Sequence, residues 1–155
     1  MAIQGNRQNE SFLDACARIH RDWHACAKAR DTEGLLALYA ADARLESPLV
    51  PALLDGRTSG VLSGHDELRA FFALGASSRP IELVRWHRSG RWLTDGERVL
   101  MWEYPRETPE GDQVEIVEIM EIEGGLIQRH RIYWGWRGTG LLVASAVRKA
   151  TGRTS

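Results

Sequence analysis

Glu118 and His130 are the residues whose types and spacing best suit acid–base chemistry. They lie on two alternating segments, 114–123 and 126–136, joined by a Glu-Gly-Gly sequence typical of a hairpin turn. A carboxylate and an imidazole that meet on a largely apolar strand face predict general acid–base catalysis. The alternative interpretation is a cross-strand ion pair that only satisfies two buried polar groups.

The register of this hairpin decides how closely the two side chains approach. A loop of three residues would pair Ile122 with Leu126 and would place Glu118 directly opposite His130. Directly opposed side chains have Cβ atoms about 5 Å apart. The same register places the arginines of the second segment together on the other face. We therefore predict a direct carboxylate–imidazole contact.

Aromatic side chains could form the wall of a binding cavity around this pair. Flat apolar walls with few polar groups suit a ring-bearing ligand, although tryptophans are also ordinary core residues. Met120 and Ile132 share the strand faces of Glu118 and His130. The predicted binding residues of this kind are Trp23, Trp102, Tyr104, Met120, Ile132 and Trp134.

Further polar candidates lie outside the hairpin. His87 could donate a hydrogen bond to a substrate oxygen, and Arg85 on the same strand face could stabilise a developing oxyanion. His20 and His24 have the four-residue spacing that can hold a metal on a helix. No third ligand has suitable spacing, so we predict a surface pair and no metal.

Composition restricts the possible functions. The 155 residues suggest one domain spanning 1–155, and 26% charged residues with a net charge of −1 give no reason to expect nucleic-acid or membrane binding. No apolar run approaches the roughly 20 residues of a membrane span, and the polar N-terminus lacks a signal-peptide pattern, so a cytoplasmic location is expected. Cys16 and Cys26 would lie about 15 Å apart along one helix, too far for a disulfide.

Helical spacing precedes strand alternation along the chain, which predicts an α+β fold. The stripe of Phe12, Cys16, Ile19, Trp23 and Cys26 predicts a first helix. The other predicted elements are a second helix capped by Asp31 or Thr32 with Leu38 and Tyr39 on its core side, a strand at 43–47, a loop at 49–64, a third helix starting near Ser63, strands at 81–88, 91–94 and 98–105, and a tail helix at 141–150.

Three segments carry a resemblance to a known superfamily. Residues 31–48 resemble the second helix and first strand of the nuclear transport factor 2-like superfamily, 63–72 its third helix, and 124–134 its closing strand. The likeness covers about residues 12–136. It implies a cone-shaped α+β barrel, in which three N-terminal helices pack on a strongly curved, mixed and mostly antiparallel sheet around a deep pocket.

The resemblance also implies positions for functional residues. The superfamily includes ketosteroid isomerases, SnoaL-like polyketide cyclases, scytalone and bile-acid dehydratases, limonene epoxide hydrolases and lignin-dimer formaldehyde lyases. The isomerases' oxyanion tyrosine, base aspartate and protonated acid correspond to Trp23, Ser47 and Glu118, and the cyclases' last-strand aspartate corresponds to Ile132. Two of the three isomerase roles are altered. Similar dehydratases place acidic residues near the first helix, which makes Asp22 a candidate.

We therefore expect a cofactor-independent lyase, dehydratase or isomerase acting on a hydrophobic, aromatic and hydroxylated small molecule, lignin-dimer-like or polycyclic. A non-catalytic ligand-binding or dimeric scaffold domain is one alternative. An epoxide hydrolase is another, and it would need Arg85 beside Glu103 or Glu118. Val117, Ile119 and Tyr133 lie on the other face of the hairpin, and this mixed patch favours a homodimer.

Overall fold

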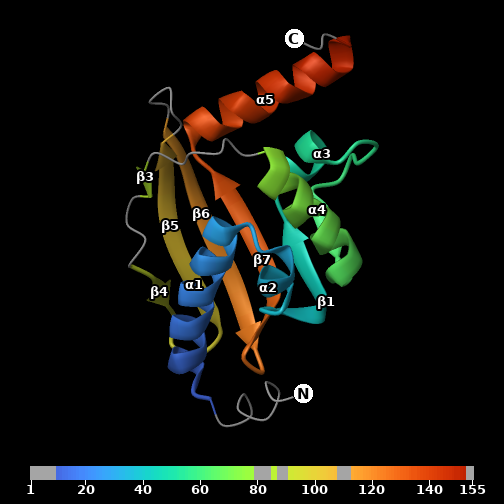
Figure 1. The fold of residues 1–155 in the computed structure, drawn as a ribbon. Coiled ribbons are helices and arrows are strands. Elements are labelled where there is room, and N and C mark those ends of the chain that lie inside the picture. Colours follow the sequence, from blue (N-terminus) through green and yellow to red (C-terminus); the bar gives the residue numbers. More distant parts are fainter. Residues whose placement is uncertain (1–9, 79–84, 87–90, 108–112, 153–155) are drawn as a thin grey trace.

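Helices pack against one curved sheet in the computed structural model, which describes residues 10–78, 85–86, 91–107 and 113–152. Figure 1 shows α1 and α2 lying over one face of the sheet, with α4 beside β1. The described elements, in chain order, are α1 (Phe12–Ala29), α2 (Thr32–Leu36), β1 (Tyr39–Glu46), α3 (Leu49–Leu53), β2 (Val61–Ser63), α4 (Gly64–Ser78), β3 (Arg85–Trp86), β4 (Leu93–Thr94), β5 (Val99–Glu107), β6 (Gln113–Glu123), β7 (Leu126–Trp134) and α5 (Trp136–Thr151).

The sheet is mixed and mostly antiparallel, which confirms the predicted α+β class. Among the described residues seven strands are present, in the order β2-β1-β7-β6-β5-β3 with β4 also paired to β5. β1 runs parallel to β7, whereas the other pairs are antiparallel. In Figure 1, α5 crosses the end of the sheet opposite the β6–β7 turn. The long strands β5, β6 and β7 form the floor beneath α1.

The first helix follows the predicted apolar stripe. Ser11 caps it, because its hydroxyl accepts a hydrogen bond from the Asp14 backbone N–H at 3.2 Å. Cys16, Ile19 and Trp23 are buried against the sheet. Both cysteines are free, as predicted. No helix in the described parts of the chain combines the length and apolarity needed to cross a bilayer.

Several predicted boundaries are wrong. The second helix ends at Leu36, and Tyr39 begins β1 instead of extending the helix. Asp31 is the cap of this helix, with its carboxylate accepting from the Gly34 N–H at 2.8 Å. The region predicted as an irregular loop contains α3 and β2, and the tail helix begins at Trp136, five residues earlier than expected. The described residues therefore form more than three helices.

The predicted hairpin register is also wrong, by two residues. Gly124 and Gly125 both have positive φ, of 57° and 72°, which makes a two-residue turn with Glu123 paired to Leu126. A bulge follows, because Ile122 pairs with Ile127 whereas Glu121 pairs with Arg129, leaving Gln128 as an extra residue.

The bulge places His130 opposite Met120 and Ile132 opposite Glu118. Glu118 and His130 are consequently diagonal neighbours and not directly opposed. They still share one face of the sheet, because the shift is an even number of residues. Tyr133 is exposed on the other face, and homodimer formation through that face stays a prediction.

Candidate active site

A cavity of about 110 Å³ lies between the helices and the sheet. Its wall is largely apolar, and Glu118 and His130 are its charged or titratable members. The lining residues are Trp23, Ala27, Leu35, Leu49, Phe71, Phe72, Gly75, Ala76, Ile116, Glu118, His130, Ile132 and Trp134. A carboxylate and an imidazole therefore face a partly open pocket whose wall is formed mainly by aromatic and aliphatic side chains.

Glu118 and His130 make a direct hydrogen-bonded contact between Oε2 and Nε2. Their exposed fractions are 1% and 0%. Diagonal residues on adjacent antiparallel strands lie about 7–8 Å apart at the backbone, within reach of long side chains. The contact predicted from the sequence is thus present, although a different register produces it.

Tyr39 extends this contact into a buried chain of hydrogen bonds. Its hydroxyl oxygen lies 2.8 Å from His130 Nδ1, and the Trp23 indole N–H donates to the same oxygen at 3.3 Å. Burial raises the pKa of the Tyr39 hydroxyl far above its ordinary value, so the hydroxyl stays protonated.

The Trp23 indole can only donate, so the Tyr39 hydroxyl accepts from it. We assign the hydroxyl hydrogen to the contact with His130 Nδ1, which then acts as the acceptor. We assign the remaining imidazole hydrogen to Nε2, which then donates to the Glu118 carboxylate. Tyr39 thereby sets the tautomer of His130 and aims an N–H at the carboxylate that lines the cavity.

Residues 20–130 match the SnoaL-like domain family. The chain belongs to the SnoaL-like domain family. The matched region begins within α1 and ends in β7, and it includes Trp23, Tyr39, Glu118 and His130. None of the curated proteins compared with the chain matches it.

Solved structures share this SnoaL-like fold. A steroid delta-isomerase from Pseudomonas aeruginosa is 18% identical, with a TM-score of 0.63 over 89% of this chain and 93% of that one. An SnoaL-like protein of unknown function from Burkholderia thailandensis is 16% identical, with a TM-score of 0.61 over 78% and 94% of the two chains. SalBIII, an epoxide hydrolase/cyclase-like enzyme in pyran ring formation in salinomycin, is 16% identical, with a TM-score of 0.58 over 81% and 94%. At these identities the likeness establishes the fold alone.

The apolar and aromatic candidates of the SnoaL-like domain divide into two groups. Trp23, Ile132 and Trp134 line the cavity. Trp102 and Met120 are buried on β5 and β6, but they are not among the lining residues. Trp102 packs edge-on against Trp23 at 5.4 Å between ring centroids and supports the wall from behind.

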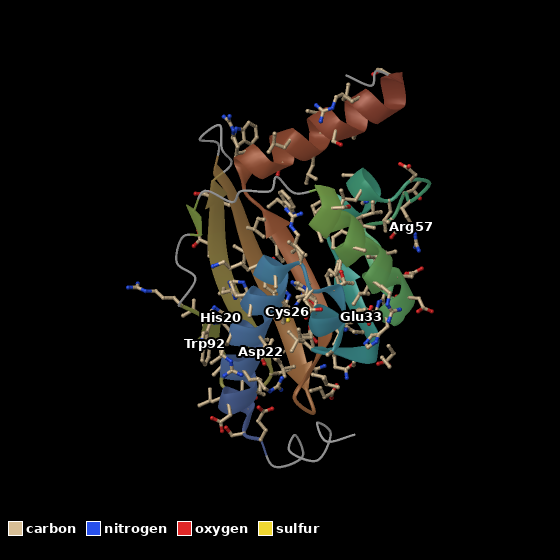
Figure 2. All side chains as sticks on the ribbon, viewed as in Figure 1. His20, Asp22, Cys26, Glu33, Arg57 and Trp92 are labelled. Atoms are coloured by element: carbon tan, nitrogen blue, oxygen red, sulfur yellow. The ribbon has the colours of Figure 1, made fainter. Side chains whose placement is uncertain are left out.

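The polar residues predicted as site residues outside the hairpin do not line the cavity where the structure describes them. The Ser47 hydroxyl accepts a hydrogen bond from the Leu49 N–H at 3.1 Å, so this residue shapes the turn into α3. Asp22 pairs with Arg21 at 2.8 Å, is 35% exposed, and is labelled on α1 in Figure 2. Neither residue lines the cavity. The side chains of Arg85 and Tyr104, and the whole of His87, lie outside the described residues.

The prediction that His20 and His24 form a surface pair is wrong. His20 is 8% exposed, its ring centroid lies 4.4 Å from that of His24, and it meets Trp102 edge-on at 5.3 Å. Burial and, to a smaller extent, the neighbouring His24 lower the pKa of His20 to about 4. No group of three or more potential metal ligands occurs in the part of the chain that the structure describes.

Tyr39 is the site residue that the sequence did not reveal, and its hydroxyl can be tested directly. Tyr39→Phe should lower the free energy of unfolding by about 1–3 kcal/mol, because His130 Nδ1 and the Trp23 N–H both lose a buried partner. Urea unfolding followed by fluorescence measures the loss. The matched control is Tyr133→Phe, since Tyr133 is 52% exposed on the same sheet. Equal stability of the two variants would contradict the assigned chain.

Proposed function

We propose that this SnoaL-like domain is a cofactor-independent lyase, dehydratase or isomerase. Its substrate is a hydrophobic, hydroxylated small molecule with a ring, held in the cavity beside Glu118 and His130. The observation that supports this function is the buried contact between the Glu118 carboxylate and the His130 imidazole in an otherwise apolar wall. A protein related in fold, the Pseudomonas aeruginosa steroid delta-isomerase, bears the name of an isomerase, which supports this class.

The burial of the pair has a chemical consequence. Charge–charge and charge–dipole interactions are stronger where water is excluded, so a proton moved between substrate and protein is guided by fixed groups instead of solvent. Positioned acids and bases of this kind typically contribute about 10²–10⁴-fold to a rate. Glu118 is the acceptor of the pair, and His130 Nε2 is its donor.

In a dehydration, the Glu118 carboxylate takes a proton from a substrate carbon, and the electron pair of that C–H bond becomes the new C=C bond. The neighbouring C–O bond breaks as the hydroxyl takes this proton from Glu118 and leaves as water, which restores the carboxylate. The Nε2 N–H of His130 holds the carboxylate by its hydrogen bond throughout. In an isomerisation, Glu118 returns the same proton to another carbon, and no group leaves.

A panel of candidate substrates tests this function. Trp23 and Trp134 line the cavity, so a ligand that enters it should change the tryptophan fluorescence. One-ring hydroxylated compounds, aromatic dimers, steroids and polyketides should be titrated in turn, and each binder incubated with the protein and analysed for a dehydrated or isomerised product. Product formation from at least one binder is the expected result. Binding without any product across the panel would contradict catalysis.

A second function is favoured by the small volume of the pocket. Ligand pockets usually have volumes of about 300–1,000 Å³, whereas this partly open one has about 110 Å³. A non-catalytic domain that holds a small ligand would need no larger space and no proton transfer. The same panel separates the two functions, because a binding domain releases its ligand unchanged.

A further inference from the structure

The C-terminal helix α5 has an apolar side that no other part of the described chain covers. The helix crosses one end of the sheet (Figure 1) and contacts β6, β7 and α3. Its less exposed positions, which mark the side that faces these elements, are Gly138, Leu142 and Ser145. Trp136, Val143 and Val147 follow at spacings of seven and four residues, so they lie together on the opposite side of the helix, its outer face. Their exposed fractions are 92%, 59% and 55%.

The outer face of α5 reverses the usual polarity of a surface helix. Such a helix turns its apolar residues toward the core and its polar residues toward water. Four of the eight large hydrophobic side chains that are exposed in the described residues belong to α5, because Leu141 is exposed beside the outer face. A group of exposed apolar side chains on one element indicates an interaction site.

The charge on this helix has a single sign. Its sequence contains Arg137, Arg148 and Lys149 and no aspartate or glutamate. Arg137 and Arg148 are exposed and lie eleven residues apart, about three turns, so both stand on one flank of the outer face. Residues 124–155 together contain six arginines and lysines and no acidic residue. The net charge of −1 for the whole chain averages over this local excess and hides it.

A second copy of the chain is the less favoured partner for the outer face. A helix of 16 residues is about 24 Å long and about 10 Å wide, so two such faces would bury roughly 500 Å², whereas stable interfaces bury at least about 1,200 Å². A symmetric antiparallel contact would also bring Arg137 of one copy near Arg148 of the other. Like charges that meet across an interface oppose association. A negatively charged lipid surface has the complementary charge and needs no matching shape.

We propose that the outer face of α5 binds the surface of an anionic phospholipid bilayer. The helix lies in the plane of the interface, with its apolar side chains at the boundary of the acyl chains and Arg148 beside the lipid phosphates. Indole rings are enriched at this depth of a bilayer, which suits the exposed Trp136 at the start of the helix. This surface is separate from Glu118 and His130, so the proposal does not depend on the proposed chemistry.

Vesicle sedimentation with the whole chain tests the charge requirement. The protein should bind vesicles of equal parts phosphatidylglycerol and phosphatidylcholine, should bind phosphatidylcholine vesicles far less, and should lose the difference at high ionic strength. Arg148→Gln should weaken binding to the anionic vesicles about fivefold. Arg44→Gln removes the same charge from an exposed position on β1 and should have no effect. Failure of the unaltered protein to bind, or equal weakening by the two substitutions, would overturn the proposal.

The apolar requirement is tested at Trp136, whose exposure makes its replacement harmless to folding. Trp136→Ala should weaken binding to the same vesicles about tenfold or more. The matched control, Leu93→Ala, alters a side chain that is 65% exposed on β4 and should leave binding unchanged. Phospholipids brominated on their acyl chains should quench the fluorescence of the unaltered protein and not that of Trp136→Phe. Equal quenching of the two proteins would mean that α5 does not enter the bilayer.

Sedimentation equilibrium without lipid separates a bilayer from a second copy. The unaltered protein and Trp136→Ala should have the same oligomeric state, because the outer face is free until it meets a membrane. A dimer that becomes a monomer in Trp136→Ala would show that the outer face joins two copies of the chain, and it would overturn the proposal.

Discussion

Glu118→Gln should lower kcat on any substrate that the panel identifies by about 10²–10⁴-fold, because the amide cannot take a proton from carbon. The protein should remain folded. Glutamine has nearly the shape of glutamate, and its carbonyl oxygen can still accept the hydrogen bond from His130 Nε2. Steady-state kinetics of the two proteins at one pH measure the effect, with KM expected to change far less than kcat.

The matched control is Glu121→Gln on the same strand. Glu121 lies on the opposite face, where it pairs with Arg98 at 3.3 Å and Arg131 at 3.2 Å. Loss of a partly exposed ion pair costs about 0–1 kcal/mol and should leave kcat unchanged. A Glu118→Gln protein that folds and retains more than about one tenth of the activity would remove the carboxylate from the proposed mechanism.

Acid should destabilise the protein at the histidine stack on α1. Burial lowers the pKa of His20 to about 4, below the ordinary value of 6.5, so the folded state binds this proton more weakly than the unfolded chain. The stabilisation by neutral His20 is complete above pH 6.5 and is lost as the pH falls toward 4. The total loss should be about 3 kcal/mol. Urea unfolding at intervals between pH 7.5 and 4 would measure it.

The neighbours of His20 explain why the charged form is poorly tolerated. Trp102 on β5 covers it edge-on, and His24 on the same helix would add a like charge if it were also protonated. Glu118 on β6 acts on His24, favouring its charged form. His20→Phe keeps a ring against Trp102 and removes the titration. Its stability should therefore fall less steeply between pH 6.5 and 4. Parallel curves for the two proteins would show that other groups control the acid transition.

Local patterns in the sequence predicted much of the fold and the central contact of the site. The stripe on α1 identified Trp23 as a buried residue facing the sheet, and strand alternation put Glu118 and His130 on cavity-facing positions. Such signals are local, because helical and strand periodicity are properties of consecutive residues. They survive an error in register so long as the error is an even number of residues.

Non-local arrangements explain what the sequence did not reveal. Tyr39 reaches His130 because β1 runs parallel to β7, with Tyr39 paired to Ile127, and no short-range pattern encodes a pairing between segments so far apart. The signal that the sequence offered was one polar aromatic residue among the apolar positions of the segment predicted as the second helix. The burial of His20 likewise depends on Trp102, which lies more than eighty residues later in the chain.

The extra residue in β7 makes hairpin length a determinant of chemistry. If Gln128 were paired regularly with Glu121 instead of forming a bulge, every side chain beyond it would exchange faces, and the imidazole would point away from the hollow while Glu118 stayed inside. A relative could thus keep both residues and lose their meeting through one inserted or deleted residue that no bulge absorbs. When active and inactive members of such a lineage are sorted, the number of residues between the acid and the base will be as informative as their identities.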